Sequence, residues 1–276
     1  MADLKDKLSE LTRLKQKMDQ FHPLSEAQVA QLGKNIRIEH VWSSNAIEGS
    51  SLNKYETASI INTGMTIHGV PLKDAMAAVD LNQAYDYMMD LASHKHSLDI
   101  TTIRDLNRLV MLKNTDIRSE AGAYRVIDVW PNGREEHPYT APYDISFQMD
   151  ELIKWASQAV EAEHPVKYAA DLHFKFVTIH PFVDGNGRTA RLLINFALTS
   201  AGYPVINIQP GKQSRTQYMK ALADGQDNHD PAQFEHLVAD YTIETLKQRI
   251  AILERNEENI AEARRDTRLT PSRKNQ

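Results

Sequence analysis

The sequence of 276 residues predicts an all-α protein. Apolar residues recur at helical spacing through most of the chain, and the first such series is Leu4, Leu8, Leu11 and Leu14, with charged residues between them. Glycine and proline stand between these series, as they do where helices stop and start. Only residues 124–130 alternate in the manner of a β-strand, so we expect helices with one small β element.

The first helix is expected from Leu4. The second begins after Ser25, a favourable N-cap residue with Glu26 in the first turn, and is expected to end at Gly49. Pro231 suits the first turn of the last helix. The later helices are expected at residues 72–92, 100–112, 145–162, 166–179, 188–200, 215–223 and 231–265.

A turn signal, Pro131-Asn132-Gly133, follows the alternating segment and predicts a short β-hairpin near residues 126–133. The organisation that we expect has three parts. An N-terminal helical region covers 1–93, the main helical core covers 94–230, and a C-terminal helix with a frayed tail covers 231–276.

Composition limits the classes of function. The net charge of −5 gives no general attraction for nucleic acid, and the absence of cysteine rules out disulfides and thiolate chemistry. No apolar run approaches the roughly 18 residues of a membrane span, and the first residues lack the apolar centre of a signal peptide. We therefore expect a cytoplasmic protein that binds neither nucleic acid nor membrane.

The run from His180 to Arg191 carries the clearest chemistry of the sequence. Pro181 disfavours helical geometry at His180, so the preceding helix should end there, and Phe182 should anchor the loop in the core. Gly185 and Gly187 then allow a tight turn and a close approach by a ligand.

The charges of this run indicate an anion site. Free N–H groups at the start of the helix that follows favour phosphate, and Arg188 and Arg191 are three positions apart on one face. Asp184 is suited to Mg²⁺ that bridges two phosphates, and neutral His180 is suited to act as a base.

Other interpretations of the same residues are less consistent with the sequence. Each feature alone is more often a helix cap, a turn or a solvated face, but their coincidence in one run is improbable as accident. A calcium loop opening at Asp184 would need ligands where Arg188 and Asn195 stand, and a Walker loop does not fit the sequence at 211–213. A zinc site from His173 and His180 lacks a third ligand.

The run resembles, position by position, the Fic-domain signature His-x-Phe-x-Asp/Glu-Gly-Asn-Gly-Arg-x-x-Arg of the Fic/Doc superfamily. The residues at 103–107 and 121–125, and Tyr218, are similar to the family as well. Asn107 stands where family members often have His, a departure that we expect to be harmless. The resemblance implies a Fic-type helical core with a hairpin flap and transfer of AMP from ATP to a hydroxyl of Ser, Thr or Tyr, with release of pyrophosphate.

The resemblance implies roles for individual residues. His180 would be the catalytic base and Asp184 would hold Mg²⁺, with Mn²⁺ as a substitute. Gln226 is a weaker candidate for the adenine pocket. The expected ATP contacts are Val177, Gly185, Asn186, Gly187, Arg188, Thr189, Ala190, Arg191 and Tyr218.

A second, shorter motif lies nearer the N-terminus. Ser44 and Glu48 share a helix face, and the stretch resembles the inhibitory motif Ser/Thr-x-x-x-Glu-Gly/Asn of one Fic subclass. We expect Glu48 to pair with Arg191, which would occupy the arginine meant for the γ-phosphate. An ordinary helix end at Gly49 is the alternative.

The expected partner is a target protein with a hydroxyl side chain, bound partly through the flap at 126–133 as an added strand. A plain structural hairpin, self-modification and a homodimer that regulates Glu48 stay open. Because family members that phosphorylate have Lys in place of Gly187, the glycine favours nucleotidyl transfer. The alternatives are a hydrolase that removes AMP, transfer of another nucleotide, and a non-catalytic nucleotide sensor.

Overall fold

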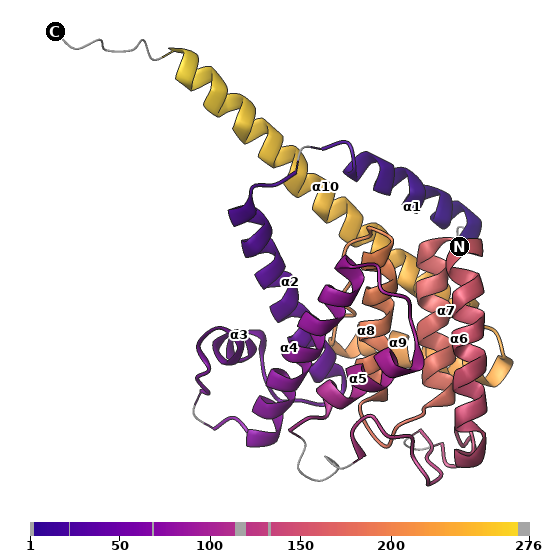
Figure 1. Cartoon of the computed structure of the whole chain (residues 1–276). Helices are drawn as coiled ribbons and strands as arrows, with labels where there is room; N and C mark the ends of the chain where they lie inside the picture. The colour runs from indigo at the N-terminus through magenta and orange to yellow at the C-terminus, as the bar shows by residue number, and fades with distance from the viewer. Residues whose placement is uncertain (1–2, 22, 68, 114–119, 132–133, 270–276) are drawn as a thin grey trace.

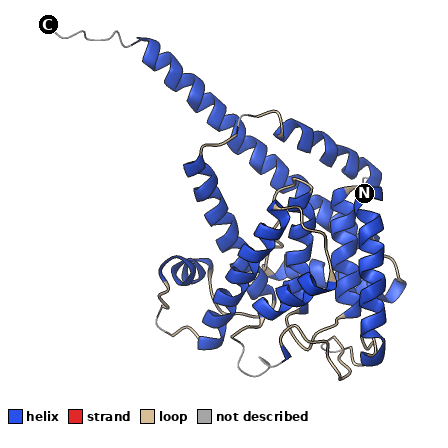
Figure 2. Ribbon diagram, in the orientation of Figure 1, coloured by secondary structure: helices blue, strands red, loops and turns tan. Residues whose placement is uncertain are grey.

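The computed structural model describes residues 3–21, 23–67, 69–113, 120–131 and 134–269. Within these ranges the regular structure is helical and contains no β-strand (Figure 2). The predicted all-α class is therefore confirmed. The helices are α1 Leu4–Met18, α2 Glu26–Ile47, α3 Lys54–Thr63, α4 Leu72–Ser93, α5 Ile100–Val110, α6 Ile145–Ala162, α7 Pro165–Ile179, α8 Asn186–Ser200, α9 Lys212–Asn228 and α10 Ala232–Leu269, with a 3₁₀ turn at Pro142–Asp144.

Helix α8 lies at the centre of the fold and packs against α7, α4 and α5 (Figure 1). Every side chain from residue 188 to residue 198 is buried, so this helix is enclosed on all its sides. The two arginines of the central run, Arg188 and Arg191, are thus buried in the core, with 8% and 4% of their surface exposed.

The sequence signals at the helix ends largely hold. Ser25 caps α2 through a complete capping box with Gln28, and the predicted bounds of α6 match the structure. Helix α3 was not predicted, although Asn53 and Glu56 form a capping box at its start that is readable in the sequence.

The predicted strand at 124–130 is not formed, and this segment is an irregular loop. The Ile127 carbonyl accepts a hydrogen bond from the Arg125 side chain at 2.7 Å and not from a neighbouring strand. Among the described residues, two backbone hydrogen bonds join the two arms of the loop, from Tyr139 N–H to the Val129 carbonyl and from Arg134 N–H to the Pro131 carbonyl, both at 3.0 Å. The predicted turn at 132–133 lies outside the described residues.

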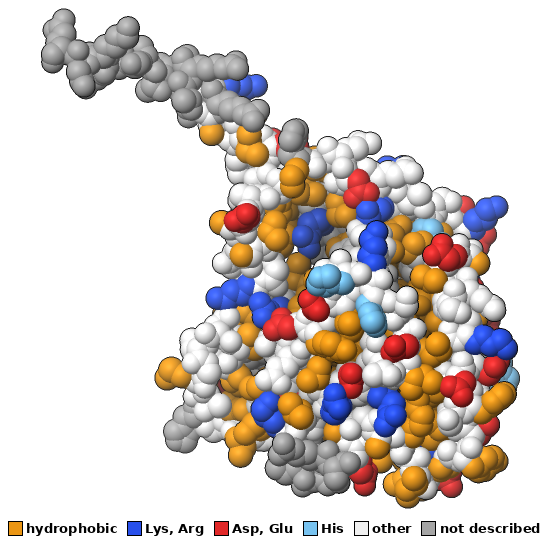
Figure 3. All heavy atoms as spheres, in the orientation of Figure 1, with side chains coloured by type: hydrophobic (Ala, Val, Ile, Leu, Met, Phe, Trp, Pro, Cys, Tyr) orange, Lys and Arg blue, Asp and Glu red, His pale blue; other side chains and the backbone are white. Residues whose placement is uncertain are grey.

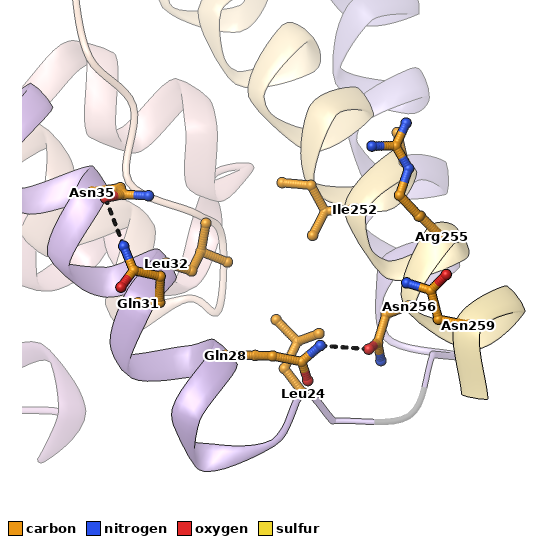
Figure 4. A pocket seen from close by; sticks show the side chains of 10 residues that line it. Leu24, Gln28, Gln31, Leu32, Asn35, Ile252, Arg255, Asn256 and Asn259 are labelled. Atoms are coloured by element: carbon orange, nitrogen blue, oxygen red, sulfur yellow. Dashed lines mark hydrogen bonds between the residues drawn. The ribbon is translucent and has the colours of Figure 1, made fainter. Parts of the chain in front are cut away.

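Helix α10 extends beyond the body of the protein and packs against α1 (Figure 1). A groove of about 410 Å³ separates the N-terminal half of α2 from α10, and Gln28 bridges it to Asn256 at 2.6 Å (Figure 4). On the face drawn in Figure 3, acidic and basic side chains are interspersed. Among the described helices, none has both the length and the apolar character that crossing a membrane requires.

Candidate functional site

The loop between α7 and α8 has the backbone that the sequence indicates. His180 ends α7 with φ +52°, in the left-handed region that non-glycine residues seldom adopt. Phe182 is 1% exposed and anchors the loop in the core. The Asn186 side chain closes the loop, since its oxygen accepts from Phe182 N–H at 3.1 Å and its amide donates to the Phe182 carbonyl at 2.8 Å.

Asn107 on α5 supports the same loop from the other side. Its amide donates to the Asp184 carbonyl at 3.0 Å, and its oxygen accepts from Gly122 N–H at 3.0 Å. Gly185 has φ +80°, and a Cβ there would stand 2.8 Å from the Asn107 amide nitrogen. The close approach of Asn107 therefore requires glycine at position 185.

A cleft of about 600 Å³ opens in front of this loop. Such a volume is in the range of small-molecule sites. Several predicted residues line it, and Trp130, Tyr139 and Arg215 add to its walls. The predicted residues that line it are Glu48, Val177, His180, Asp184, Gly187, Arg191, Tyr218 and Gln226.

The other predicted residues support the cleft from behind. Gly185, Asn186, Thr189 and Ala190 are buried in the loop and the first turns of α8, and Ser44 is buried on α2. Arg188 is also buried, where its Nη2 lies 3.3 Å from Asp184 Oδ1. This contact ties the Asp184 side chain to α8.

His180 is held in the neutral state expected of a base. Burial lowers its pKa to about 4, and the charge of Arg125 adds to the decrease. A backbone contact with Val177 and the carboxylates of Glu48 and Asp184 oppose it. The ring of Tyr139 stacks on His180 with centroids 3.9 Å apart and planes 10° apart, a contact that the sequence did not reveal.

Arg191 reaches the cleft between α2 and α9. Its Nε donates to Ser44 Oγ at 2.8 Å, and its Nη2 donates to the Ser44 carbonyl at 2.9 Å and to Glu48 Oε1 at 2.6 Å. Nη1 lies 3.4 Å from the hydroxyl of Tyr218, which also contacts His173 Nε2 at 3.0 Å. Ser44 and Glu48 thus engage Nε and Nη2, while Nη1 lies against Tyr218 on α9.

The Glu48 carboxylate lies at the start of α8, where the sequence predicts an anion site. Desolvation raises its pKa, but the charge of Arg191 and its hydrogen bond outweigh that effect, so the pKa lies below its ordinary value and the group is ionised near neutral pH. A Cβ at Gly187 would collide with Glu48 Oε1. The glycine is therefore what lets this carboxylate approach the start of α8.

Three contacts at intervals of four residues join α2 to α8. His40 Nδ1 lies 3.3 Å from Asn195 Nδ2, Ser44 contacts Arg191, and Glu48 lies against Gly187. The residue numbers rise along one helix and fall along the other, so the two faces meet in antiparallel register. We call this set of contacts the α2–α8 ladder.

Comparisons with known proteins give the family of this region of the chain. Residues 97–198 match the family model described as Fic/DOC family. The chain belongs to the Fic/DOC family. Its Fic domain as matched thus includes α5, α6, α7, the whole run from His180 to Arg191 and most of α8.

Curated Fic relatives are similar over most of the chain. Protein adenylyltransferase Fic of Aedes aegypti is 35% identical over 240 residues, which is 85% of this chain and 46% of that protein. The same-named protein of Drosophila grimshawi is 33% identical and is covered over 48% of its length. This Fic chain thus spans about half the length of the curated relatives that it matches.

Solved Fic structures share the fold. Fic-1 of C. elegans superimposes with a TM-score of 0.82 at 24% identity, over 92% of this chain and 73% of that one. A Fic domain containing signaling protein from Bacteroides thetaiotaomicron has a TM-score of 0.78 at 26% identity, over 89% of this chain and 98% of that one.

Proposed function

We propose that this Fic chain is an autoinhibited protein adenylyltransferase, which transfers AMP from ATP to a Ser, Thr or Tyr hydroxyl of a target protein or of itself. The observation that carries the proposal is one cleft that joins a neutral histidine, an anion site and a carboxylate placed on the arginine of that site. The name of the curated relatives, protein adenylyltransferase Fic, supports the same activity.

The reaction uses His180 as the general base. Its neutral ring takes the proton of the target hydroxyl, whose oxygen attacks the α-phosphorus of ATP. A bond forms between that oxygen and the phosphorus, the bond to the bridging oxygen breaks, and pyrophosphate leaves with the electron pair. Positioning and stabilisation of charge do most of the work in such a transfer, so the N–H groups at the start of α8 and the Arg191 guanidinium matter most.

Mg²⁺, or Mn²⁺ in its place, would enter with ATP as part of the substrate complex. The carboxylate that fits it is Asp184, whose side chain is 51% exposed at the cleft while Arg188 holds its Oδ1. No group of three His, Asp or Glu side chains in the described ranges could hold a metal ion by itself. The remaining ligands would therefore be phosphate oxygens and water.

Glu48 would inhibit AMP transfer by occupying the place of an ATP phosphate group. Its carboxylate takes the Nη2 donor of Arg191 and lies against Gly187, where phosphate oxygens of a reactive ATP would bind. ATP could then bind only with its phosphates turned from the line of attack. Withdrawal of the C-terminal end of α2 would free both groups together.

Removal of AMP by hydrolysis is a second candidate for the same cleft. Only Oε1 of Glu48 contacts Arg191 among the described residues, and the side chain is 40% exposed. The second oxygen is therefore able to orient a water molecule toward an AMP-modified protein. On this alternative Glu48 would be required for activity, whereas on the first it restrains activity.

The deciding experiment compares wild type, Glu48→Gly and His180→Ala with Mg²⁺ and ATP labelled on the α-phosphate, alone and with cell lysate. Label on protein that rises in Glu48→Gly and is lost when His180→Ala is added supports an autoinhibited transferase. No label from any variant that still binds ATP would refute it. Loss of label from pre-modified protein with wild type but not with Glu48→Gly would favour the hydrolase.

A further inference from the structure

Arg125 gathers backbone carbonyls from two separate segments. The residue is 2% exposed, and its Nε donates to the His180 carbonyl at 2.8 Å. Nη1 donates to the Ile127 carbonyl at 2.7 Å, and Nη2 donates to the Thr140 carbonyl. The Arg125 backbone N–H also donates to the Pro181 carbonyl at 2.9 Å.

The acceptors of Arg125 are unusual for a buried cation. No carboxylate of the described residues forms an ion pair with Arg125. The N–H donors of its forked guanidinium group are satisfied by carbonyl oxygens alone. Burial lowers the pKa of Arg125, with the charge of Asp128 acting in the opposite direction. A buried guanidinium remains charged because its ordinary pKa is so high, so its positive charge stands close to the His180 ring.

The two sets of acceptors have different tasks in the proposed reaction. His180 and Pro181 belong to the strained end of α7, where the base has φ +52°. Ile127 and Thr140 lie on the two arms of the loop whose Trp130, Pro131 and Tyr139 line the cleft. One planar side chain with fixed donor directions thus ties the backbone of the base to both arms of the cleft wall.

We propose that Arg125 is the positioning residue that couples the loop arms at 124–131 and 134–140 to the base His180. The inference rests on the proposed function, because it assigns the loop to the target side of the cleft and His180 to proton transfer. Arg125 does not line the cleft, so it acts through these two elements and not by contact with ATP. Removing its fork should slow transfer while ATP still binds.

The charge of Arg125 gives a second, separable signature. The groups that face His180 are Arg125, Glu48 from the end of α2, Asp184 from the motif loop and Tyr139 from the loop arm. Arg125 lowers the His180 pKa and the two carboxylates raise it. Loss of the arginine charge therefore raises the His180 pKa. On acidification, the rate of transfer then begins to fall at a higher pH than it does with Arg125 present.

The test uses the full chain with Glu48→Gly, into which Arg125→Gln, Arg125→Lys or Arg104→Gln is introduced. Arg104 is the matched control, since its Nε donates to the Gly122 carbonyl at 2.8 Å without touching His180. Initial rates of label transfer from α-labelled ATP are measured against pH, and ATP affinity is measured by calorimetry.

We expect Arg125→Gln to slow transfer by roughly 10- to 100-fold at neutral pH, as small misplacements of a base do, with ATP affinity within about twofold of the parent. The acid limb of the pH–rate profile of Arg125→Gln, where the rate falls as His180 is protonated, should move to higher pH. Arg125→Lys keeps the charge but not the fork, so it should slow transfer without moving the acid limb, and Arg104→Gln should do neither.

Three results would overturn the inference. They are an unchanged rate in Arg125→Gln, a loss of ATP affinity in step with the rate, and an acid limb that is the same in the Gln and Lys variants. Should Arg125→Gln not fold, a normal rate in Arg125→Lys would refute the need for the fork. If the Glu48→Gly parent transfers no label, the proposed function fails instead, and NMR titration of His180 in the two variants still measures the effect of the charge.

Discussion

Ser44→Ala tests whether the proposed inhibited state depends on more than the Glu48 carboxylate. Arg191 is 4% exposed and donates from Nε to Ser44 Oγ at 2.8 Å, and Ser44 itself is 1% exposed. Alanine would leave that N–H facing a methyl group in the closed arrangement. The same N–H would be hydrated, or turned to phosphate, once α2 has withdrawn.

The size of the effect follows from the difference between the two states, because the Arg191 N–H loses its partner only in the closed arrangement. Loss of a hydrogen bond to a charged group costs about 1.5–3 kcal/mol. The lower end applies, because Nη2 of Arg191 keeps the Ser44 carbonyl at 2.9 Å and Glu48 at 2.6 Å. A change of about 1.4 kcal/mol alters an equilibrium tenfold, so Ser44→Ala should raise label transfer by up to about tenfold and less than Glu48→Gly does.

The control is the neighbouring serine. Ser43 is equally buried, but its hydroxyl donates to the His40 carbonyl within α2 and does not touch Arg191. Initial rates from α-labelled ATP would be compared for Ser44→Ala, Ser43→Ala and wild type. Equal rates in the two variants, whether raised or unchanged, would refute the assigned role of the Ser44 hydroxyl.

Three further expectations concern the loop and the base. Glu48→Gly should lose label transfer only as the pH falls to about 4 or below, because the ring must be neutral to accept a proton and loss of the Glu48 charge lowers the His180 pKa further; a midpoint near the ordinary 6.5 would contradict this. Gly185→Ala should lower the free energy of unfolding by about 1–3 kcal/mol, since its φ is +80°, whereas Gly33→Ala within α2 should raise it by about 0.5–1 kcal/mol; denaturant titration measures both. Asn107→Ala should lower the melting temperature and slow transfer in the Glu48→Gly variant, as the Asp184 carbonyl and Gly122 N–H lose their partner; unchanged values would show that the loop is held by other contacts.

The helical fold was predictable because its signals are local. Apolar periodicity and the Ser25 cap place α2, and Pro181 correctly ends α7 at His180. The predicted strand failed because β-propensity expresses a fit to a neighbouring strand, and the loop has none. Val126 is instead 87% exposed.

Part of the candidate site could likewise be predicted from the sequence, and part could not. The contiguous run at 180–191 could be read from residue types, since a base, a carboxylate, glycines and arginines each have a chemical signature. Arg125 and Asn107 could not be recognised as supports, because their partners are mostly backbone groups that any residue supplies. Tyr139 stacks on His180 through a loop whose path no local pattern encodes.

The α2–α8 ladder bears on the way in which α2 could move. Its contacts recur every four residues on both helices, so the nearest alternative packing is a slide of about one turn, or ~5.4 Å. Such a slide toward the start of α8 would set Ile36 against Asn195 and His40 against Arg191. Asn195 would then face an apolar side chain in place of a polar one. Arg191 would face a neutral imidazole, because the His40 pKa of about 4 opposes protonation. The observed register of α2 on α8 is therefore favoured over this slide toward the start of α8.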